Sequence, residues 1–331
     1  MFGKNKPLFC SEARNYGFNN IIRKYANFPW YIPLPCHFEH GWTMLSEPLK
    51  SDLHRGGQFM LVHSKRRLIA WRKKSKLPVY VIGSPFVLYK NMKRIKKNKN
   101  AQGTVVCPSH STYDLSADFH VQNFCDELKK MPKKYHPITI CLFWTDYIDR
   151  SSHTYRKNGF KVVTAGFRIG NSLSFVSNFY KILSRHKYAV SNDIGSATFY
   201  AVDMRLPFFL VGDMPVVRNN KNRDVNIGAS STMVDHEIGR KAWKLFSGGP
   251  QDIITRQQSM FVDSELGIRD NVSPNQLNKL LWQYAKKDKY WYAKIPGHIL
   301  ETLVYDIVFN GPWGGWLMKQ RYNIAKRSKN E

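Results

Sequence analysis

The stretch from 188 to 213 constrains the fold more than any other part of the sequence. Residues 188–190 are apolar enough to end a buried strand, and 191–196 form a polar turn that contains a glycine. Helix-compatible spacing follows over 197–204, and 208–211 is an apolar run suited to a strand buried on both faces. A strand, a polar turn, a helix and a second strand in this order predict a βαβ unit of a parallel sheet.

The same alternation of short apolar runs and helical patterns fills most of the chain before this stretch. The predicted strands are 59–63, 78–82, 104–107, 138–143 and 161–164, and the predicted helices are 65–74, 119–131, 151–158 and 172–184. After the stretch, 214–234 reads as a long polar loop, and helices are expected at 235–246, 253–266, 273–285 and 296–309. We therefore expect an α/β fold in which two Rossmann-like domains face a cleft, with C-terminal helices.

A basic segment at 90–103 with almost no apolar residues is the best candidate for a linker between these domains. The chain has 331 residues, which is more than most single cores accommodate. We place the N-terminal domain at 1–95, the C-terminal domain at 96–265, and the closing helices with a basic aromatic tail at 266–331. The closing helices are expected to pack back on the N-terminal half.

The net charge of +27 implies an anionic partner, because 51 Lys and Arg residues face only 24 Asp and Glu residues. Nucleic acid, a membrane face and a phosphate-bearing substrate all fit this charge, and so do plain solvated helix faces. No zinc-finger spacing and no aromatic RNA-binding strand motif is present in the sequence. Nucleic-acid binding is therefore an unlikely function, supported by charge alone.

The cysteine pattern favours a reducing compartment. The five cysteines include no Cys-x-x-Cys pair, so neither a disulfide framework nor a zinc site is expected, and we predict no metal. Residues 1–20 lack the apolar core of a signal peptide, and no stretch approaches the roughly 20 apolar residues of a membrane span. We expect a cytoplasmic protein that is soluble or attached only at a membrane surface.

Polar side chains follow each predicted strand of the second half, where open α/β sheets bind ligands. Histidine, arginine and hydroxyl groups there suit a phosphate, and the free N–H groups of a helix start favour one as well. A tryptophan at such a strand end can stack on a nucleobase. The alternative interpretation is that these residues only form turns, pair with charges on the surface or pack in the core. The candidate donor-binding residues are His110, Ser111, Thr112, Trp144, Asp146, Arg168, Asn192, Asp193, Gly195 and Ser196.

The first half carries His37, Glu39 and His40 within four residues. Glu39 and His40 are candidates for a catalytic base, because a reaction that deprotonates a hydroxyl needs a proton acceptor in a partly dry cleft. Two histidines three residues apart could also hold a metal, but no clear third ligand lies nearby in the sequence. Buried, hydrogen-bonded core histidines are the plain alternative.

Several of these motifs resemble the GT-B-fold bacterial glycosyltransferases of capsule and O-antigen (surface polysaccharide) biosynthesis. His40-Gly41 is similar to the His-Gly pair in their N-terminal half. The turn at 191–196 and the Pro-hydrophobic strand at 207–209 are similar to the strand, turn and helix of their C-terminal half. A C-terminal Glu-x7-Glu pattern, typical of retaining members, is absent from the sequence.

The resemblance implies an enzyme that transfers a sugar from a nucleotide-sugar co-substrate, with inverting chemistry, no metal and no further cofactor. The donor would bind the 96–265 domain, and the 1–95 domain would hold the acceptor and supply Glu39 or His40 as base. His110 and Ser196 occupy places comparable to those of enzymes that use CMP-activated acidic sugars. However, Ser111 follows His110 where those enzymes have proline, which leaves the donor nucleotide open.

The acceptor implied by the resemblance is a growing, lipid-linked saccharide at the inner face of the plasma membrane. The basic aromatic tail would contact anionic lipid there through Trp316, Lys319, Arg321 and Arg327. Three alternatives stay open at this point. They are a phosphotransferase that moves glycerol or polyol phosphate from a CDP donor, a basic nucleic-acid-binding protein, and a sugar-binding scaffold without catalysis.

Overall fold

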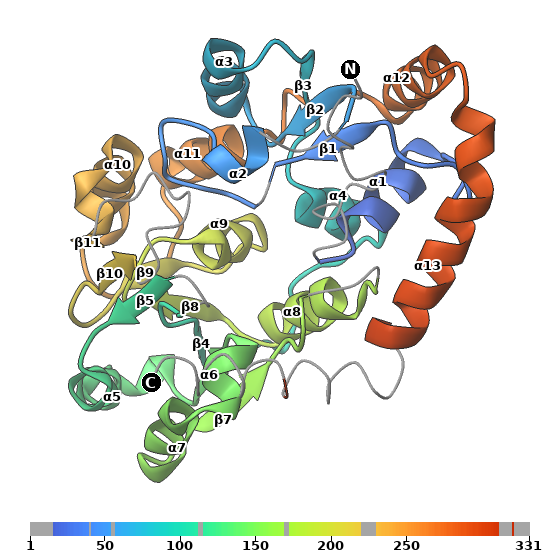
Figure 1. Ribbon diagram of the computed structural model, residues 1–331. Helices are drawn as coiled ribbons and strands as arrows, with labels where there is room; N and C mark the ends of the chain where they lie inside the picture. The colour runs from blue at the N-terminus through green and yellow to red at the C-terminus, as the bar shows by residue number, and fades with distance from the viewer. Residues whose placement is uncertain are drawn as a thin grey trace.

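The computed structural model describes residues 16–39, 41–53, 57–111, 115–168, 172–219, 230–310 and 320. Two parallel β-sheets organise this part of the chain, and helices pack around and between them (Figure 1). The predicted α/β class with parallel sheets is therefore confirmed.

The first sheet has three parallel strands in the order β1-β2-β3. They are β1 (Cys36–Phe38), β2 (Phe59–Val62) and β3 (Val79–Val81). Strand β1 was not expected from the sequence, because prolines surround it and only three residues pair with β2. The helices of this part of the chain are α1 (Phe18–Ala26), α2 (Lys50–Leu53), α3 (Lys65–Lys74) and α4 (Pro85–Met92).

The second sheet has five parallel strands in the order β7-β6-β4-β8-β9. They are β4 (Thr104–Val106), β6 (Ile138–Leu142), β7 (Lys161–Thr164), β8 (Tyr188–Ser191) and β9 (Phe208–Leu210). All five lie within the runs predicted as strands or one residue beyond them. The connected helices are α5 (Val121–Lys130), η2 (Lys133–Tyr135), α6 (Trp144–Ile148), α7 (Arg150–Lys157), α8 (Ser174–Ser184) and α9 (Ser196–Asp203).

Neighbouring residues of these strands enter different apolar clusters, as expected for a sheet covered on both faces. Val106 packs with Phe124 of α5 and Tyr155 of α7. Val105 joins a separate cluster that contains Phe179 of α8 and residues of α9. The second sheet is therefore wound with helices on both sides.

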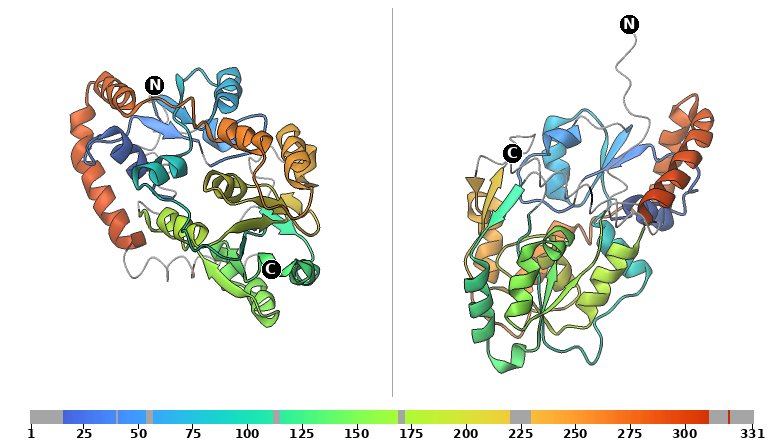
Figure 2. Two further views of the ribbon diagram at one scale, coloured as in Figure 1. Left: turned by 180° about the vertical axis from the view of Figure 1, so that it is seen from behind. Right: turned by 60° about the horizontal axis from the view of Figure 1, so that its bottom comes forward.

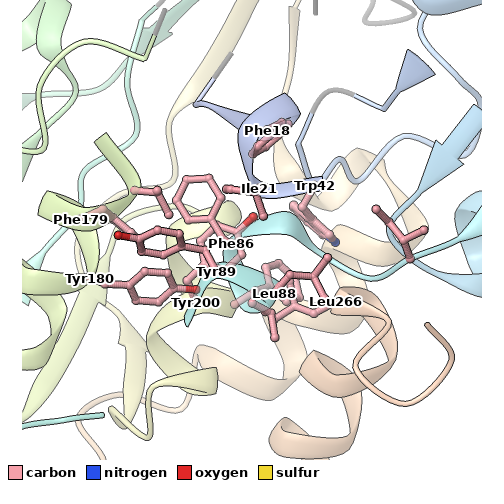
Figure 3. Close-up of a cluster of buried hydrophobic side chains, with 14 of the residues drawn as sticks. Phe18, Ile21, Trp42, Phe86, Leu88, Tyr89, Phe179, Tyr180, Tyr200 and Leu266 are labelled. Atoms are coloured by element: carbon pink, nitrogen blue, oxygen red, sulfur yellow. The ribbon is translucent and has the colours of Figure 1, made fainter. Parts of the chain in front are cut away.

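The two sheets share one apolar cluster. Figure 3 shows Phe86 of α4 among side chains of α1, α8, α9 and α11 (Arg256–Leu266). The Phe86 and Tyr200 rings stack with centroids 4.5 Å apart, and the Ser84 Oγ lies 3.0 Å from the Tyr200 hydroxyl. Because this core runs between the sheets, the predicted division into two domains across a cleft is not confirmed.

The basic segment predicted as a linker does lead from the first sheet to the second, but it packs closely on the second. Lys90 Nζ contacts the Asp203 carboxylate at 2.7 Å, and the Asn98 N–H donates to the Ser184 carbonyl over 2.8 Å. Lys90 thus contacts the end of α9 and the Asn98 backbone contacts the end of α8, so the segment is not a free connection.

The later helices are η3 (Met233–Asp235), α10 (Glu237–Phe246), α11 (Arg256–Leu266), α12 (Pro274–Lys287), η4 (Trp291–Lys294) and α13 (Ile295–Asn310). Helix α12 packs on the first sheet, where the Tyr284 ring lies 4.5 Å from the Phe59 ring. Helix α13 forms one edge of the molecule in the views of Figures 1 and 2. No helix within the described residues is long and apolar enough to cross a membrane.

A small antiparallel sheet replaces part of the loop predicted at 214–234. Its strands are β5 (Leu115–Asp118), β10 (Val216–Asn219) and β11 (Ser230–Ser231), in the order β11-β10-β5. The loop prediction was wrong here because β10 is only four residues long and partly exposed. A run this short gives too little apolar pattern to mark a strand in a sequence.

Candidate active site

The candidate site lies at the carboxyl ends of β4 and β8, which are neighbours in the second sheet. After β4, the chain adds β6 and then β7 on one side of it. It then crosses to the other side of β4 and adds β8 and β9 there. The strand order therefore reverses between β4 and β8. Open α/β sheets bind ligands outside the carboxyl ends of their strands at such a point.

Hydrogen bonds tie the loops after these two strands together. The Ser109 N–H donates to Asn192 Oδ1 over 2.9 Å, and the Ser109 hydroxyl donates to Asp193 Oδ2 over 3.2 Å. The Ile194 N–H donates to the other Asp193 oxygen over 2.7 Å. Because Asn192 Oδ1 accepts a backbone N–H, the amide orientation is set and Nδ2 is the group left to bind something else.

Two nitrogen donors near this point have no hydrogen-bond partner among the described residues. They are Asn192 Nδ2 and Arg168 Nη1, and both atoms are buried. Asn192 as a whole is 1% exposed, and Arg168 follows β7. Since buried donors are nearly always paired in folded proteins, each of the two marks a place for an acceptor that the described residues do not supply.

His110 follows β4 and lies close enough to Arg168 to be affected by its charge. Its side chain is exposed to solvent, yet its ring packs on Phe143 with centroids 4.4 Å apart. Loss of hydration lowers the pKa of His110 to about 4, and the nearby Arg168 charge lowers it further in the same direction. The imidazole is therefore neutral at pH 7, and an arriving anion would raise its pKa.

Two carboxyl groups at the site have pKa values near neutrality. Burial raises the pKa of Asp146 to about 7, helped by Asp149 and opposed by a bond from the Ser111 backbone. Burial also raises the pKa of Asp193 to about 6, opposed by the bonds from Ile194 and Ser109. Carboxyl groups with such values can exchange protons at physiological pH.

Helix α9 begins at the same edge of the sheet. Gly195 is extended, with φ −141°, and a Cβ placed on it would meet nothing within 4 Å in the described structure. Ser196 opens the helix, whose first N–H groups and dipole favour an anion. Asn192, Gly195 and Ser196 are therefore close together in the chain, between the end of β8 and the start of α9.

The first sheet brings the end of β1 to this helix. A Cβ placed on Gly41 would lie 4.0 Å from Ser196 Oγ. The next residue, Trp42, packs its ring 4.2 Å from Phe199 of α9 and donates from Nε1 to Glu265 Oε2 over 2.8 Å. Gly41 therefore lies near the predicted donor turn, although about 150 residues separate the two in the sequence.

Glu39 is not placed to take a proton from a substrate. It is 1% exposed, and its Oε1 accepts from Arg67 Nε over 2.6 Å and from Trp71 Nε1 over 2.9 Å. Burial alone would raise the Glu39 pKa, but His63 and the Arg67 guanidinium outweigh it and hold the value at about 2. The expected role as base is thus corrected to a structural one, in which Glu39 fixes α3 to the end of β1.

Trp144 is also placed differently from the expectation. The side chain is buried, and its ring packs 5.0 Å from Phe167 and 6.1 Å from Phe143. A face that is occupied by packing is not open to a nucleobase, so the predicted stacking role does not fit this structure. The neighbouring Thr145 hydroxyl instead donates to the Ser111 carbonyl over 3.2 Å, which links the β6 and β4 loops.

Some predicted residues lie outside the described part of the chain. They are His40, Thr112, Trp316, Lys319, Arg321 and Arg327. Within the described part, no group of three His, Cys, Asp or Glu side chains is arranged to hold a metal. Sequence reasoning missed Ser109, although its position in Pro-Ser-His-Ser directly after a strand is the same signal that pointed to His110.

No protein-family model and no curated protein matches this chain. Among solved structures, it is similar to the UDP-GlcNAc 2-epimerase from Neisseria meningitidis bound to UDP-GlcNAc, at 12% identity and a TM-score of 0.38, over 82% of this chain and 81% of that chain. It is also similar to the wall teichoic acid polymerase TagF, at 11% identity and a TM-score of 0.31, over 87% and 68% of the two chains. Similarity this low assigns neither fold nor activity, so function must be argued from the residues of this chain.

Proposed function

We propose that this chain is a transferase that binds a nucleotide-activated sugar through its phosphates at the carboxyl ends of β4, β7 and β8. The observation that supports this most is the pair of buried donors, Asn192 Nδ2 and Arg168 Nη1, that have no partner among the described residues. A diphosphate offers several acceptor oxygens and a negative charge, which fits an amide, a guanidinium and a helix start together.

The same groups would stabilise the leaving phosphate without a metal. Charge that develops on the phosphate as the sugar departs is favoured by fixed donors in a partly dry site. His110, neutral at pH 7, gains a proton more readily as negative charge builds beside it. Ser111 and Asp193 hold the loops in place through their bonds to neighbouring strands.

For the acceptor side, we propose His40 as the base that deprotonates a saccharide hydroxyl. Its neighbour Gly41 lies near the start of α9, since a Cβ placed on Gly41 would be 4.0 Å from Ser196 Oγ. An inverting reaction needs one such base and no protein nucleophile. A lipid-linked saccharide as acceptor, implied by the resemblance to GT-B transferases, is part of this proposal.

A thermal-shift screen of CMP-, CDP-, UDP-, GDP- and dTDP-sugars, with CDP-glycerol included, tests the proposal. We expect one nucleotide class to raise the melting temperature of the wild-type protein and to be turned over in the presence of an acceptor. His40→Ala should abolish turnover and leave that shift intact. A response to CDP-glycerol alone would favour the polyol phosphotransferase. A lack of response to every compound would contradict the proposed donor site.

A further inference from the structure

The exposed large hydrophobic side chains of this protein are unevenly distributed along the chain. Seven of the twelve found within the described residues belong to two short segments, 30–31 and 290–304. Leu300 is 65% exposed and Leu303 and Val304 are each 51% exposed, at spacings of three and four residues that put them on one face of α13. The others are Trp30, Tyr31, Tyr290 and Tyr292.

Helix α13 directly follows η4, which carries Tyr292, and forms an outer edge of the molecule in Figures 1 and 2. Its other side packs on the chain, because His298 Nε2 lies 3.1 Å from the Trp30 carbonyl oxygen and 3.3 Å from the Arg23 guanidinium. His298 is two residues before Leu300, so it lies on the opposite side of the helix from the exposed apolar side chains. We call Leu300, Leu303 and Val304, with Tyr290 and Tyr292 before them in the chain, the α13 surface.

A lysine borders the α13 surface, because Lys289 Nζ lies 5.9 Å from the Tyr290 ring centroid. Lys287 precedes it in the chain, and its Nζ lies 4.2 Å from the ring centroid of Tyr284, a buried residue of α12. Together with Lys286, these lysine side chains are exposed. The nearby Asp288 already pairs with Lys294, so the border is positive overall.

We propose that the α13 surface binds the face of an anionic lipid bilayer. Tyrosine side chains favour the bilayer interface, leucine and valine suit the acyl boundary, and lysines beside them attract anionic headgroups. A second copy of the chain fits less well, because pairing this surface with itself would bring two sets of lysines together within a chain of net charge +27. This inference does not rest on the donor site.

Vesicle flotation with the full chain tests the proposal. The wild type should bind vesicles of equal phosphatidylcholine and phosphatidylglycerol and bind pure phosphatidylcholine much more weakly. The triple variant Leu300→Ser, Leu303→Ser, Val304→Ser should bind the anionic vesicles at least about tenfold more weakly, because each apolar side chain removed takes buried area from the contact. The matched control is Ile253→Ser with Met260→Ser, two exposed hydrophobics outside this surface.

A second pair of variants separates local from general charge. Lys286→Gln, Lys287→Gln, Lys289→Gln should weaken binding by on the order of 100-fold, since each lysine near an anionic surface contributes on the order of fivefold. The exposed set Lys93→Gln, Lys96→Gln, Lys99→Gln carries the same charge change and should have a clearly smaller effect. Equal losses from both sets would mean that the net charge, and not this surface, holds the protein on lipid.

Two further results would overturn the proposal. One is a triple serine variant that binds anionic vesicles as tightly as the wild type. The other is a wild-type dimer in light scattering that the same variant converts to a monomer, because the surface would then be an interface between copies. All variants should keep the wild-type melting temperature and the response to the nucleotide-sugar, so a failure here is separable from a failure of the donor site.

Discussion

At the carboxyl end of the first sheet, Glu39 is 1% exposed, its charge is paired with Arg67, and its Oε1 also accepts from Trp71. Its Oε2 has no hydrogen bond among the described residues but lies 3.8 Å from His63 Nδ1. At the carboxyl end of the second sheet, Asn192 is equally buried but keeps one amide donor without a partner among the described residues. Both sheets are parallel, and both end in polar residues. Topology alone therefore does not make a site, because the pairing of the polar groups decides whether they hold the fold or remain available to a ligand.

The largest effect should come from removing the charge partner of Glu39 at the end of the first sheet. Arg67→Ala leaves the Glu39 carboxylate buried without its charge partner, which should lower the free energy of unfolding by about 3–5 kcal/mol. Urea denaturation measures it. Lys74→Ala, which breaks the exposed pair with Glu47, is the control and should cost less than about 1 kcal/mol. A loss for Arg67→Ala no greater than that of the control would contradict the structural role of Glu39.

At the end of the second sheet, removing an unpaired donor should lower the affinity for the nucleotide-sugar. Arg168→Ala removes a charge-assisted bond to the donor phosphate, so the dissociation constant for the nucleotide-sugar should rise about 10- to 100-fold. Calorimetry measures this constant. Arg269→Ala, at a guanidinium paired with Asp263 on the surface, should leave it unchanged. If both variants bind equally well, Arg168 is not a donor ligand.

The raised pKa of Asp146 gives the site a pH dependence. Asp146 titrates at about 7, and a bound phosphate favours its protonated, neutral form. Affinity should therefore fall as the pH rises above 7, by up to about tenfold per pH unit, and binding at pH 7 should take up protons. Calorimetry in buffers with different ionisation enthalpies detects the uptake. Asp146→Asn should reduce both effects, leaving the smaller contributions of Asp193 and His110, and an unaltered pH profile in that variant would exclude Asp146 as their source.

The smallest effect should come from the helix start. Ser196→Ala removes one neutral hydroxyl from the donor site, so the dissociation constant should rise only about 2- to 10-fold. Ser174→Ala changes the first residue of α8 in the same way and should have no effect on binding. A similar loss in both variants would point to a general effect on helix stability.

The sequence was sufficient for most elements of the second sheet, since β6 and β8 are continuous apolar runs bounded by polar turns. It also identified the strand ends that carry His110 and Asn192. The strand order was not predictable, because alternating strands and helices fit several orders of a parallel sheet. The strands β1 and β10 were missed because they are only three and four residues long, too short to show a clear apolar pattern.

The errors at the site have a common cause. Glu39 reads as a reactive carboxylate until Arg67 and Trp71, about 30 residues later, are known to surround it. Trp144 reads as a stacking platform until Phe167 is known to cover it. Burial and pairing depend on side chains distant in the sequence, so residue type and local spacing could not reveal them.

The most direct test of the donor site is calorimetric titration of the Asn192→Asp variant with the nucleotide-sugar identified in the screen. Aspartate matches asparagine in shape and retains the acceptor for the Ser109 N–H, but it replaces the unpartnered donor with a negative oxygen. We predict that nucleotide-sugar binding is lost while the folded structure, followed by circular dichroism, is retained. Wild-type affinity in this variant would contradict the proposal that Asn192 and its neighbours bind the donor phosphates.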